Sequence, residues 1–335
     1  MVSAELKSDT SEHDMVIQVE GVTKQFGKIF AVNNASFSVP RGKIFGFIGP
    51  SGCGKTTMVR LMAGIYEPTK GNISVLGQRP IDFNARTREK IGYMPQLFAL
   101  YPDLSIWENM NFAASLYGMG LFRRRRFNEL LDFVELSKHK RKLASKISGG
   151  MKRRLSLAAT LVHKPELIFL DEPTAGIDPV LRRKFWDHFK ALHKDGRTLF
   201  VTTQYVGEAA YCDYVGLMVD GRLLMVETPD GLRKNAFGGE VIDMVITESV
   251  TEEKHLAPLL ELDFVEKESE QPVVKVTDNS IRLIVDEAST ALPALITWAK
   301  NKDITIETIE EYLPPFDDVF VKIVERERNR DKSLA

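Results

Sequence analysis

The segment around residue 50 combines glycine, lysine and threonine at a spacing that can hold phosphates. Residues 49–57 read Gly-Pro-Ser-Gly-Cys-Gly-Lys-Thr-Thr, directly after the apolar run 44–48, and fit the pattern G-x-x-x-x-G-K-[ST]. Glycines allow backbone N–H groups to curve around an anion, and the helix that comes next presents its positive end. Lys55 is expected to reach the β- and γ-phosphates, and the Thr56 hydroxyl to ligate magnesium. The pattern predicts a nucleoside triphosphate site, against the alternative of an ordinary glycine-rich turn between a strand and a helix. The binding residues expected from this loop are Gly49, Pro50, Ser51, Gly52, Cys53, Gly54, Lys55, Thr56 and Thr57.

Two carboxylates come directly after a second buried-strand pattern. Residues 167–172 read Leu-Ile-Phe-Leu-Asp-Glu. An acidic residue at the end of such a strand can hold magnesium, directly or through water, opposite a phosphate loop, and Asp171 fits this role. Glu172 fits a general base that polarises the attacking water, because it comes just after the strand and is expected to face the nucleotide. The simpler alternative is that the pair only marks the end of a strand before Pro173.

A small glycine motif opens a helix pattern farther along the chain. Ser148-Gly149-Gly150-Met151 precedes helical spacing over 152–162. Ser148 is a natural N-cap, and the paired glycines leave backbone amides uncovered at the positive end of the helix. An N-cap alone is common, but this one lies between a phosphate loop and a strand-terminal Asp-Glu pair. In this combination the chain resembles the ATP-binding-cassette (ABC) ATPases, whose signature is usually Leu-Ser-Gly-Gly-Gln.

The resemblance covers roughly residues 16–235 and extends to three further positions. Phe26 matches the aromatic residue that stacks on adenine in that family. Gln96 matches the glutamine that contacts magnesium and the attacking water and senses the transmembrane partner. Asp178 matches the acidic loop that bridges subunits. The simpler interpretations are that Phe26 is a core aromatic residue, Gln96 a polar loop residue and Asp178 an N-cap ahead of Pro179. Asp178 can be a cap and a bridge at once.

Two positions depart from the usual motifs of the family. Met151 replaces the glutamine of the signature, and little loss is expected because the amides of Gly149 and Gly150 supply the anion contacts. Gln204 stands where the family usually has histidine. Glutamine keeps a donor amide but cannot titrate. Because Glu172 is retained, we expect hydrolysis to persist; the alternative is a degenerate site that binds ATP without turnover.

These departures are similar to those of the daunorubicin-resistance type of exporter ATPase. The basic run 152–154 after the signature, the segment 202–205 and the ending 314–320 carry this closer resemblance. It implies an ATP-hydrolysing, energy-coupling subunit of an exporter for a drug, a lipid or a similar amphiphile.

The family resemblance also implies how the nucleotide site is completed. The signature of one subunit completes the site of another, which implies two composite sites in a head-to-tail homodimer, or a heterodimer with a related chain. Mg²⁺ and ATP are the implied cofactors. The implied catalytic residues are Glu172, Gln204 and Gln96, and the implied metal ligands are Thr56, Gln96 and Asp171. Beyond the phosphate loop, the implied nucleotide contacts are Phe26, Ser148, Gly149, Gly150 and Asp178.

The implied partners are separate transmembrane permease subunits that dock near Gln96 and residues 97–120. No run approaches the roughly 18 apolar residues that cross a bilayer, so a position at the cytoplasmic face of the membrane is expected through partners. A net charge of −1 gives no global field for nucleic acid, and no such partner is expected. Cys53 and Cys212 are too few for a disulfide framework and indicate a reducing compartment.

Other interpretations stay open at this point. An ABC importer ATPase would use the same cassette, and no single residue excludes it. A soluble ABC switch acting on nucleic acid or ribosomes usually carries two cassettes or long coiled coils, whereas this chain has one phosphate loop. The run Arg123–Arg126 could lie near anionic headgroups or a partner, although a solvated start of a helix is the simpler interpretation.

The elements that must position these residues form an α/β pattern. Compact β-type runs at 44–48, 167–170, 198–203 and 215–219, separated by helical segments, predict a mostly parallel sheet. The expected fold is a P-loop NTPase of the ABC cassette type, with a parallel core, an antiparallel β part and a helical subdomain, and then a small C-terminal α+β domain. Among the elements expected in that last domain are a strand at 264–267 and a final helix at 316–324.

The length of 335 residues favours two domains. The expected divisions are a disordered leader at 1–14, a nucleotide-binding domain at 15–237 with its helical subdomain at about 95–165, a linker at Gly238-Gly239, an accessory domain at 240–326 and a tail at 327–335.

Overall fold

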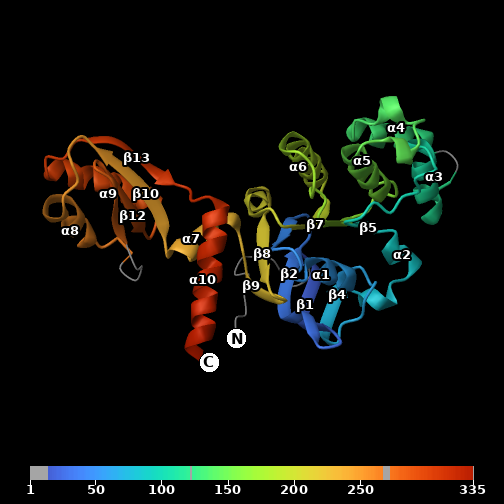
Figure 1. Ribbon diagram of the computed structural model, residues 1–335, viewed down its shortest axis with the longest axis horizontal. Helices are drawn as coiled ribbons and strands as arrows, with labels where there is room; N and C mark the ends of the chain where they lie inside the picture. Colours follow the sequence, from blue (N-terminus) through green and yellow to red (C-terminus); the bar gives the residue numbers. More distant parts are fainter. Residues whose placement is uncertain (1–13, 121–122, 267–271, 335) are drawn as a thin grey trace. The chain divides into compact units, whose positions relative to one another are not determined.

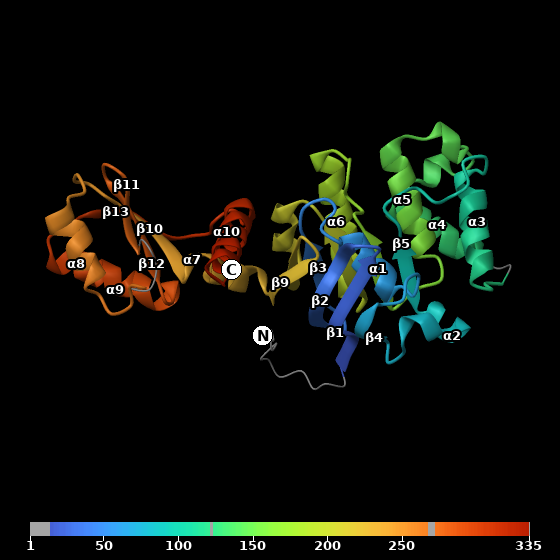
Figure 2. The same ribbon diagram turned by 60° about the horizontal axis from the view of Figure 1, so that its bottom comes forward.

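The computed structural model describes residues 14–120, 123–266 and 272–334, and the chain divides into two units, Met1–Glu227 and Thr228–Ala335 (Figures 1 and 2). The strands of the first unit are β1 (Met15–Phe26), β2 (Ile29–Pro40), β3 (Ile44–Ile48), β4 (Lys70–Val75), β5 (Ile91–Met94), β6 (Leu167–Asp171), β7 (Thr198–Thr203), β8 (Tyr214–Val219) and β9 (Arg222–Glu227). Its α-helices are α1 (Lys55–Met62), α2 (Ala85–Arg88), α3 (Ile106–Leu116), α4 (Arg124–Phe133), α5 (Gly149–Thr160) and α6 (Pro179–Lys194).

The central sheet of the first unit has six strands in the order β5-β6-β7-β3-β8-β9. β5, β6, β7, β3 and β8 run parallel, and β9 returns antiparallel to β8. The strands β3 and β6 are buried along their whole length, which explains their continuous apolar sequences. Since parallel strands share one carboxyl edge, the segments after β3, β6 and β7 meet there.

A second, antiparallel sheet of order β2-β1-β4 packs with α1 against the central sheet. Aromatic rings form part of the shared core: the rings of Phe45 and Phe200 stack with centroids 5.3 Å apart, and Phe37 lies 5.5 Å from Phe45. Offset stacking of buried rings adds to the free energy gained from burying their area. This core holds β3 and α1, the two elements that flank the phosphate loop.

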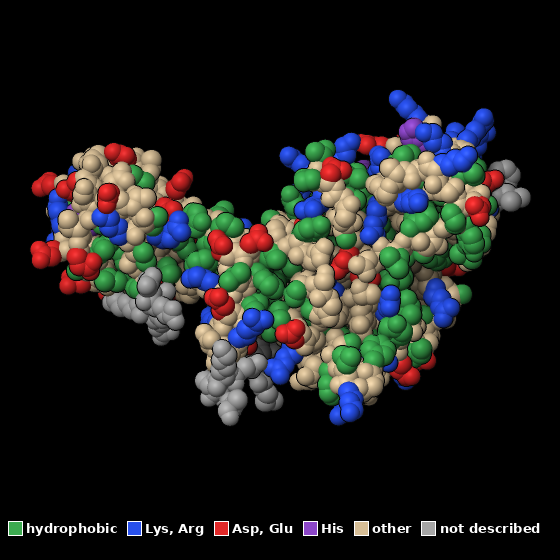
Figure 3. Space-filling view, in the orientation of Figure 1, with side chains coloured by type: hydrophobic (Ala, Val, Ile, Leu, Met, Phe, Trp, Pro, Cys, Tyr) green, Lys and Arg blue, Asp and Glu red, His purple; other side chains and the backbone are tan. Residues whose placement is uncertain are grey.

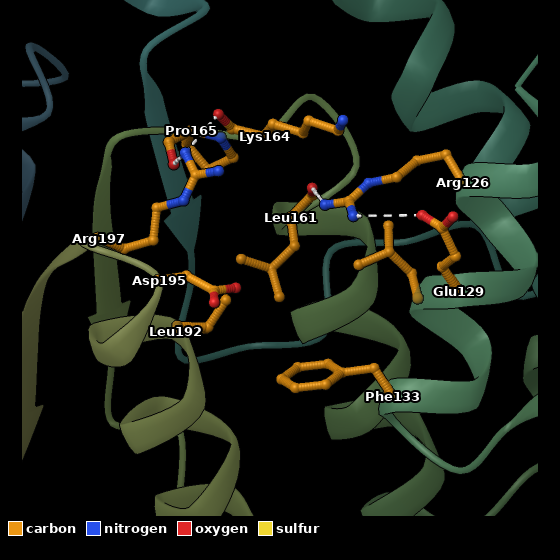
Figure 4. Close-up of a pocket in the computed structure, with 10 residues that line it drawn as sticks. Arg126, Glu129, Phe133, Leu161, Lys164, Pro165, Leu192, Asp195 and Arg197 are labelled. Carbon is orange, nitrogen blue, oxygen red and sulfur yellow. Dashed lines mark hydrogen bonds and ion pairs between the residues drawn. The ribbon is translucent and has the colours of Figure 1, made fainter.

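The helices α3, α4 and α5 form a helical subdomain inserted between β5 and β6, and Lys and Arg side chains gather over it (Figure 3). Two arginines line a cavity of about 330 Å³ between this subdomain and the segment from α6 to β7 (Figure 4). Arg126 of α4 donates to the carbonyl of Leu161 at 2.8 Å, and Arg197 donates to that of Lys164 at 2.9 Å. These bonds connect the turn after α5 to α4 and to the residue that precedes β7.

The second unit is an α+β domain with a four-stranded antiparallel sheet of order β11-β12-β10-β13. Its elements are α7 (Pro229–Phe237), β10 (Glu240–Ile246), a π-helix (Glu252–Leu256), α8 (Ala257–Leu260), β11 (Val273–Thr277), β12 (Ser280–Val285), α9 (Ala288–Asn301), β13 (Ile306–Tyr312) and α10 (Phe316–Leu334). Leu259 of α8 and Leu295 of α9 are buried in one core with the apolar side chains of the sheet.

The boundary between the units lies between Glu227 and Thr228, about one helix earlier than the Gly238-Gly239 linker expected from the sequence. The reason is that α7 packs on α10: Arg233 lies 4.0 Å from the ring centroid of Phe316, and Lys322 lies 4.1 Å from that of Phe237. Gly238 instead caps α7, with φ of 83°.

Other expected boundaries also need correction. The expected tail at 327–335 continues α10 as far as Leu334. The expected strand at 264–267 forms only an isolated bridge between Val265 and Val285, and residue 267 lies outside the described residues. The expected leader also lies outside them, except for Asp14, whose carbonyl accepts a hydrogen bond from the Arg41 amide. Within the described ranges, no helix is both long and apolar enough to cross a membrane.

Candidate functional site

The loop between β3 and α1 needs glycine for steric reasons. A Cβ at Gly49 would lie 2.0 Å from the carbonyl oxygen of Met218, and one at Gly54 would lie 2.1 Å from that of Ala31. Gly54 also has φ of 113°, which side-chain-bearing residues rarely adopt. The amide of Gly221 donates to the carbonyl of Cys53 at 3.0 Å and anchors the loop to the β8–β9 turn. The backbone is therefore fixed in the curved shape that the sequence pattern predicts.

Lys55 lies at the start of α1 with its ammonium group folded back on the loop. Its Nζ donates to the carbonyls of Gly49 at 2.8 Å and Pro50 at 3.0 Å, and it pairs with Glu172 Oε1 at 3.3 Å. The side chains of Lys55 and Glu172 are 3 % and 8 % exposed. A buried cation is thus held at the mouth of the loop, at the place where an anion can replace its carbonyl partners.

Asp171, the last residue of β6, is bonded to hydroxyl groups from two neighbouring elements. Its Oδ1 accepts from Thr56 at 3.0 Å and from Thr202 at 2.8 Å. Its Oδ2 is buried and has no hydrogen-bond partner among the described residues. Burial raises the pKa of this carboxyl above its ordinary value, while the hydrogen bonds from Thr202 and Thr56 act in the opposite direction.

Glu172 comes next in the chain and has an unusual backbone. Its φ is 47°, in the left-handed region, and its amide donates to Thr202 Oγ1 at 2.9 Å. Gln96, from the loop after β5, donates to Glu172 Oε2 at 2.8 Å, so each carboxylate oxygen of Glu172 has a partner. A strained residue that is held by its surroundings at a polar cluster is typical of functional sites.

Gln204 lies beside the phosphate loop, directly after β7. The hydroxyl of Ser51 donates to Gln204 Oε1 at 2.7 Å, which leaves the amide NH₂ group as a donor. The structure therefore brings Gln204, Gln96, Glu172, Asp171, Thr56 and Lys55 to one edge of the central sheet.

The five other expected positions, Phe26, Ser148, Gly149, Gly150 and Asp178, lie at the ends of three other elements. Phe26 is 44 % exposed at the end of β1 and packs edge-on against Tyr66. Ser148 caps α5, with its hydroxyl accepting from the Met151 amide at 3.3 Å, and Asp178 caps α6. Within the described residues, no hydrogen bond or ion pair joins the segment 148–150 to the phosphate loop.

Known proteins resemble this chain in sequence and in fold. The family model described as ABC transporter matches residues 32–175. The daunorubicin resistance ATP-binding protein DrrA3 of Streptomyces coeruleorubidus is 34 % identical over 321 residues, which cover 94 % of this chain and 98 % of that protein. This chain belongs to the ABC transporter family. The expected membership of the ABC family and the similarity to the daunorubicin-resistance type are confirmed.

Other ABC proteins match about two thirds of this chain. The probable multidrug ABC transporter ATP-binding protein YbhF of Escherichia coli K12 is 37 % identical over 231 residues, and this chain spans only 40 % of its length. A solved ATP-binding subunit of an ABC transporter superposes with a TM-score of 0.60 at 26 % identity, covering 66 % of this chain and 92 % of that one. A dimeric ABC cassette bound to ADP and phosphate gives 0.59 at 27 % identity, covering 63 % and 98 %. The expected cassette fold is confirmed.

Two residues of this ABC site were missed from the sequence. Thr202 donates to Asp171 and accepts from the Glu172 amide. The sequence feature that could have identified it is a polar residue near the end of β7, the strand next to β6. Arg153 of α5 is half-buried, and burial lowers its pKa while the carboxylates of Glu172 and Asp171 oppose that change. Its position had no signal in sequence spacing, because it depends on how α5 packs.

Proposed function

We propose that this chain is the ATP-hydrolysing, energy-coupling subunit of an ABC exporter. The observation that carries the proposal is the Glu172 carboxylate, held between Lys55 and Gln96 at the edge where the phosphate loop also lies. Relatives support the direction of transport: their names include daunorubicin resistance, linearmycin resistance and Nod factor export ATP-binding proteins. A drug, a lipid or a similar amphiphile is the proposed cargo.

The phosphate loop binds the triphosphate through its backbone amides and the positive end of α1. Lys55 exchanges its two loop carbonyls for the terminal phosphate oxygens, which are better partners for a buried ammonium group because they are charged. Phe26, exposed at the end of β1, is available to stack on the adenine ring.

The donor set around Asp171 fits magnesium. Its unpartnered Oδ2, the Thr56 hydroxyl and the Gln96 amide oxygen are hard oxygen ligands of the kind that Mg²⁺ prefers. Bound Mg²⁺ would neutralise charge on the terminal phosphates during phosphoryl transfer. A cation here would also offset the cost of burying the Asp171 charge.

Glu172 takes the proton of the attacking water, and the amide of Gln96 keeps its carboxylate oriented. When Lys55 turns to the phosphates, Oε1 of Glu172 loses its partner and can accept the proton of the water. The NH₂ group of Gln204 donates to the transferring phosphoryl group, in the position that a histidine usually takes. Hydrolysis therefore does not depend on a titrating residue at position 204.

The Ser148-Gly149-Gly150 segment acts on a second chain. Its uncovered amides lie at the start of α5, and Asp178 caps α6. The starts of the two helices are neighbours, because a Cβ at Gly150 would lie 2.6 Å from Cδ2 of Leu181 in α6. Two copies, or one copy and a related chain, would close on ATP with these segments facing the opposite phosphate loops. Dimeric solved cassettes support this arrangement.

A transmembrane permease docks on the groove between the end of α3 and the segments that follow α1 and surround α2. This hollow of about 800 Å³ is lined by apolar side chains that include Ile65, Phe83, Leu116 and Tyr117. Ile65 and Leu116 are 51 % and 69 % exposed, and Leu97 beside Gln96 is 79 % exposed. Exposed apolar surface of this kind marks a protein interface. We therefore propose a position at the cytoplasmic face of the membrane, and we expect no nucleic-acid partner.

The test is ATP turnover by the purified chain with its membrane partner. Glu172→Gln keeps the size and shape of the side chain but replaces one acceptor oxygen with an NH₂ group and removes the base, so turnover should fall about a hundredfold or more while ATP binding is retained. Equal turnover by the wild-type chain and the Glu172→Gln variant would refute the proposed ATPase. Co-purification of the chain with ribosomes or DNA, and with no membrane protein, would refute the transporter role.

A further inference from the structure

The helical subdomain carries a concentration of positive charge that ATP hydrolysis does not use. Residues 123–154 contain twelve Lys and Arg but three Asp and Glu, in a chain whose net charge is −1. Figure 3 shows the basic side chains gathered over this part of the first unit. Exposed lysines at 138, 142 and 146 contribute to it. The rest of the chain is therefore acidic overall, and the surplus is local.

Part of this charge surrounds a hollow of about 590 Å³, here called the Trp107 hollow. It is lined by Ser105, Trp107, Glu108, Arg124, Lys140, Arg141 and Leu143. Lys140 Nζ lies 5.7 Å from the ring centroid of Trp107. The hollow thus combines one aromatic ring with cations from two different segments, the start of α4 and the loop before α5.

The cations of the Trp107 hollow lack internal counter-charges. Among the residues that the structure describes, no carboxylate lies within 4.0 Å of Arg124, Lys140 or Arg141. The neighbouring Arg125, by contrast, pairs with Glu129 at 2.9 Å. Glu108, the acidic residue of the hollow, accepts from the Ser105 amide at 2.7 Å as part of a capping box. Three basic side chains are left to bind an anion from outside.

We propose that the Trp107 hollow binds the phosphate headgroups of anionic phospholipids at the membrane surface. Guanidinium and ammonium groups are the usual partners of phosphate, and each Lys or Arg near an anionic membrane surface adds to the attraction. Tryptophan prefers the level of the headgroups, where its ring meets apolar and polar surroundings together. The choice of a membrane over another polyanion rests on the proposed function, which places the chain at the bilayer.

The test is co-sedimentation of the full chain, without nucleotide, with sucrose-loaded vesicles. Vesicles of equal parts phosphatidylcholine and phosphatidylglycerol are compared with phosphatidylcholine alone. The wild-type chain should bind the anionic vesicles and release them at high salt. Each membrane-facing cation that is neutralised lowers the affinity for anionic vesicles about fivefold. The variant Arg124→Gln/Lys140→Gln/Arg141→Gln should therefore bind roughly a hundredfold more weakly than the wild-type chain.

The matched control removes three exposed positive charges elsewhere, as Lys70→Gln/Lys300→Gln/Lys302→Gln, and should bind almost as the wild type does. Circular dichroism checks that both variants fold. ATP turnover is measured on the same samples and should be equal in all three proteins, so a failed ATPase and a failed lipid site give different results. Equal binding by the two triple variants would overturn the proposal. So would equal binding to both vesicle types, or binding to inorganic phosphate or an RNA oligonucleotide but not to vesicles.

Discussion

At the scale of single residues, the proposed site depends on side chains that are held before the nucleotide arrives. Glu172 has a left-handed backbone, which costs of order 1–3 kcal/mol, and it keeps this conformation because Thr202 bonds its amide. Lys55, Gln96 and Thr56 are each already bonded to a carboxylate of the site. Preorganised groups of this kind need little rearrangement when charge develops during the reaction.

Gln204→His tests the departure from the usual histidine. The wild-type chain should show no inflection in its pH–rate profile from position 204, because an amide does not titrate. The variant should remain active and gain an inflection near the ordinary histidine pKa of about 6.5. The measurement is the ATPase rate as a function of pH for both proteins. Identical pH–rate profiles for the two proteins would contradict the position given to residue 204 at the phosphate, and loss of all turnover in Gln204→His would contradict the expectation that histidine can replace glutamine there.

Thr202→Val tests how Asp171 is kept ready for magnesium. The Thr202 hydroxyl favours the ionised form of Asp171, so its loss should raise the pKa of Asp171 further. Mg²⁺ binds the carboxylate form, and affinity is lost as the pH falls through this pKa. The acidic limb of Mg²⁺-dependent ATP binding should therefore move to higher pH in the variant.

The loss of Thr202 also leaves the buried Glu172 amide with a poorer partner, which should lower the free energy of unfolding by about 1–3 kcal/mol. Titration calorimetry over a pH series and urea denaturation measure the two effects. An exposed serine is the matched control, and Ser145→Ala should change neither quantity. An acidic limb at the wild-type position would contradict the role given to Thr202.

At the scale of elements, the parallel sheet does most of the positioning, and this part was predictable. The buried runs at 44–48, 167–170 and 198–203 identify β3, β6 and β7, and parallel strands bring the loops at their carboxyl ends to one edge. The order of the strands was not predictable, since β3 pairs with β7 and β8, which are more than a hundred residues away. Strand propensity carries no information about such distant partners.

Boundaries failed where tertiary contacts override local signals. Gly238-Gly239 has the composition of a linker, but α7 before it is bound to α10 through Arg233 and Lys322. The sequence around 327–335 is highly polar, yet it continues α10 as far as Leu334. At the first boundary, the deciding contacts come from α10, about eighty residues farther along the chain. At the second boundary, no break in the helical spacing marks an earlier end of α10.

Gly49→Ala tests the contact between the phosphate loop and β8. The added Cβ would meet the Met218 carbonyl oxygen at 2.0 Å, and neither backbone can yield without moving its strand. The free energy of unfolding should fall by about 3 kcal/mol and ATP affinity should be lost. Gly207→Ala is the control, because a Cβ there has no neighbour within 4 Å. Thermal denaturation measures stability, and binding of a fluorescent nucleotide measures affinity. Equal stability and equal affinity of the two variants would contradict the role given to Gly49.

At the scale of the whole molecule, the parts of the proposed nucleotide site lie on two separated surfaces of one chain. The phosphate loop, Glu172 and Gln204 lie at the edge of the central sheet, whereas Ser148-Gly149-Gly150 lies at the start of α5 in the helical subdomain (Figure 1). Within the described residues, no hydrogen bond or ion pair joins them. In the proposed dimer, a second copy would supply the missing half of the site, ATP would bind both surfaces, and hydrolysis would break that connection.

The most direct test of this account is the ATPase rate of a mixture of two inactive variants. Lys55→Ala removes the phosphate contact, and Ser148→Arg places a bulky cation at the signature. Each variant alone has both composite sites damaged and should be inactive. A mixed pair has one site with an intact phosphate loop from one chain and an intact signature from the other, so mixing should restore part of the wild-type rate. A mixture that stays inactive at every ratio, under conditions where the wild-type chain turns over, would contradict the two-chain site.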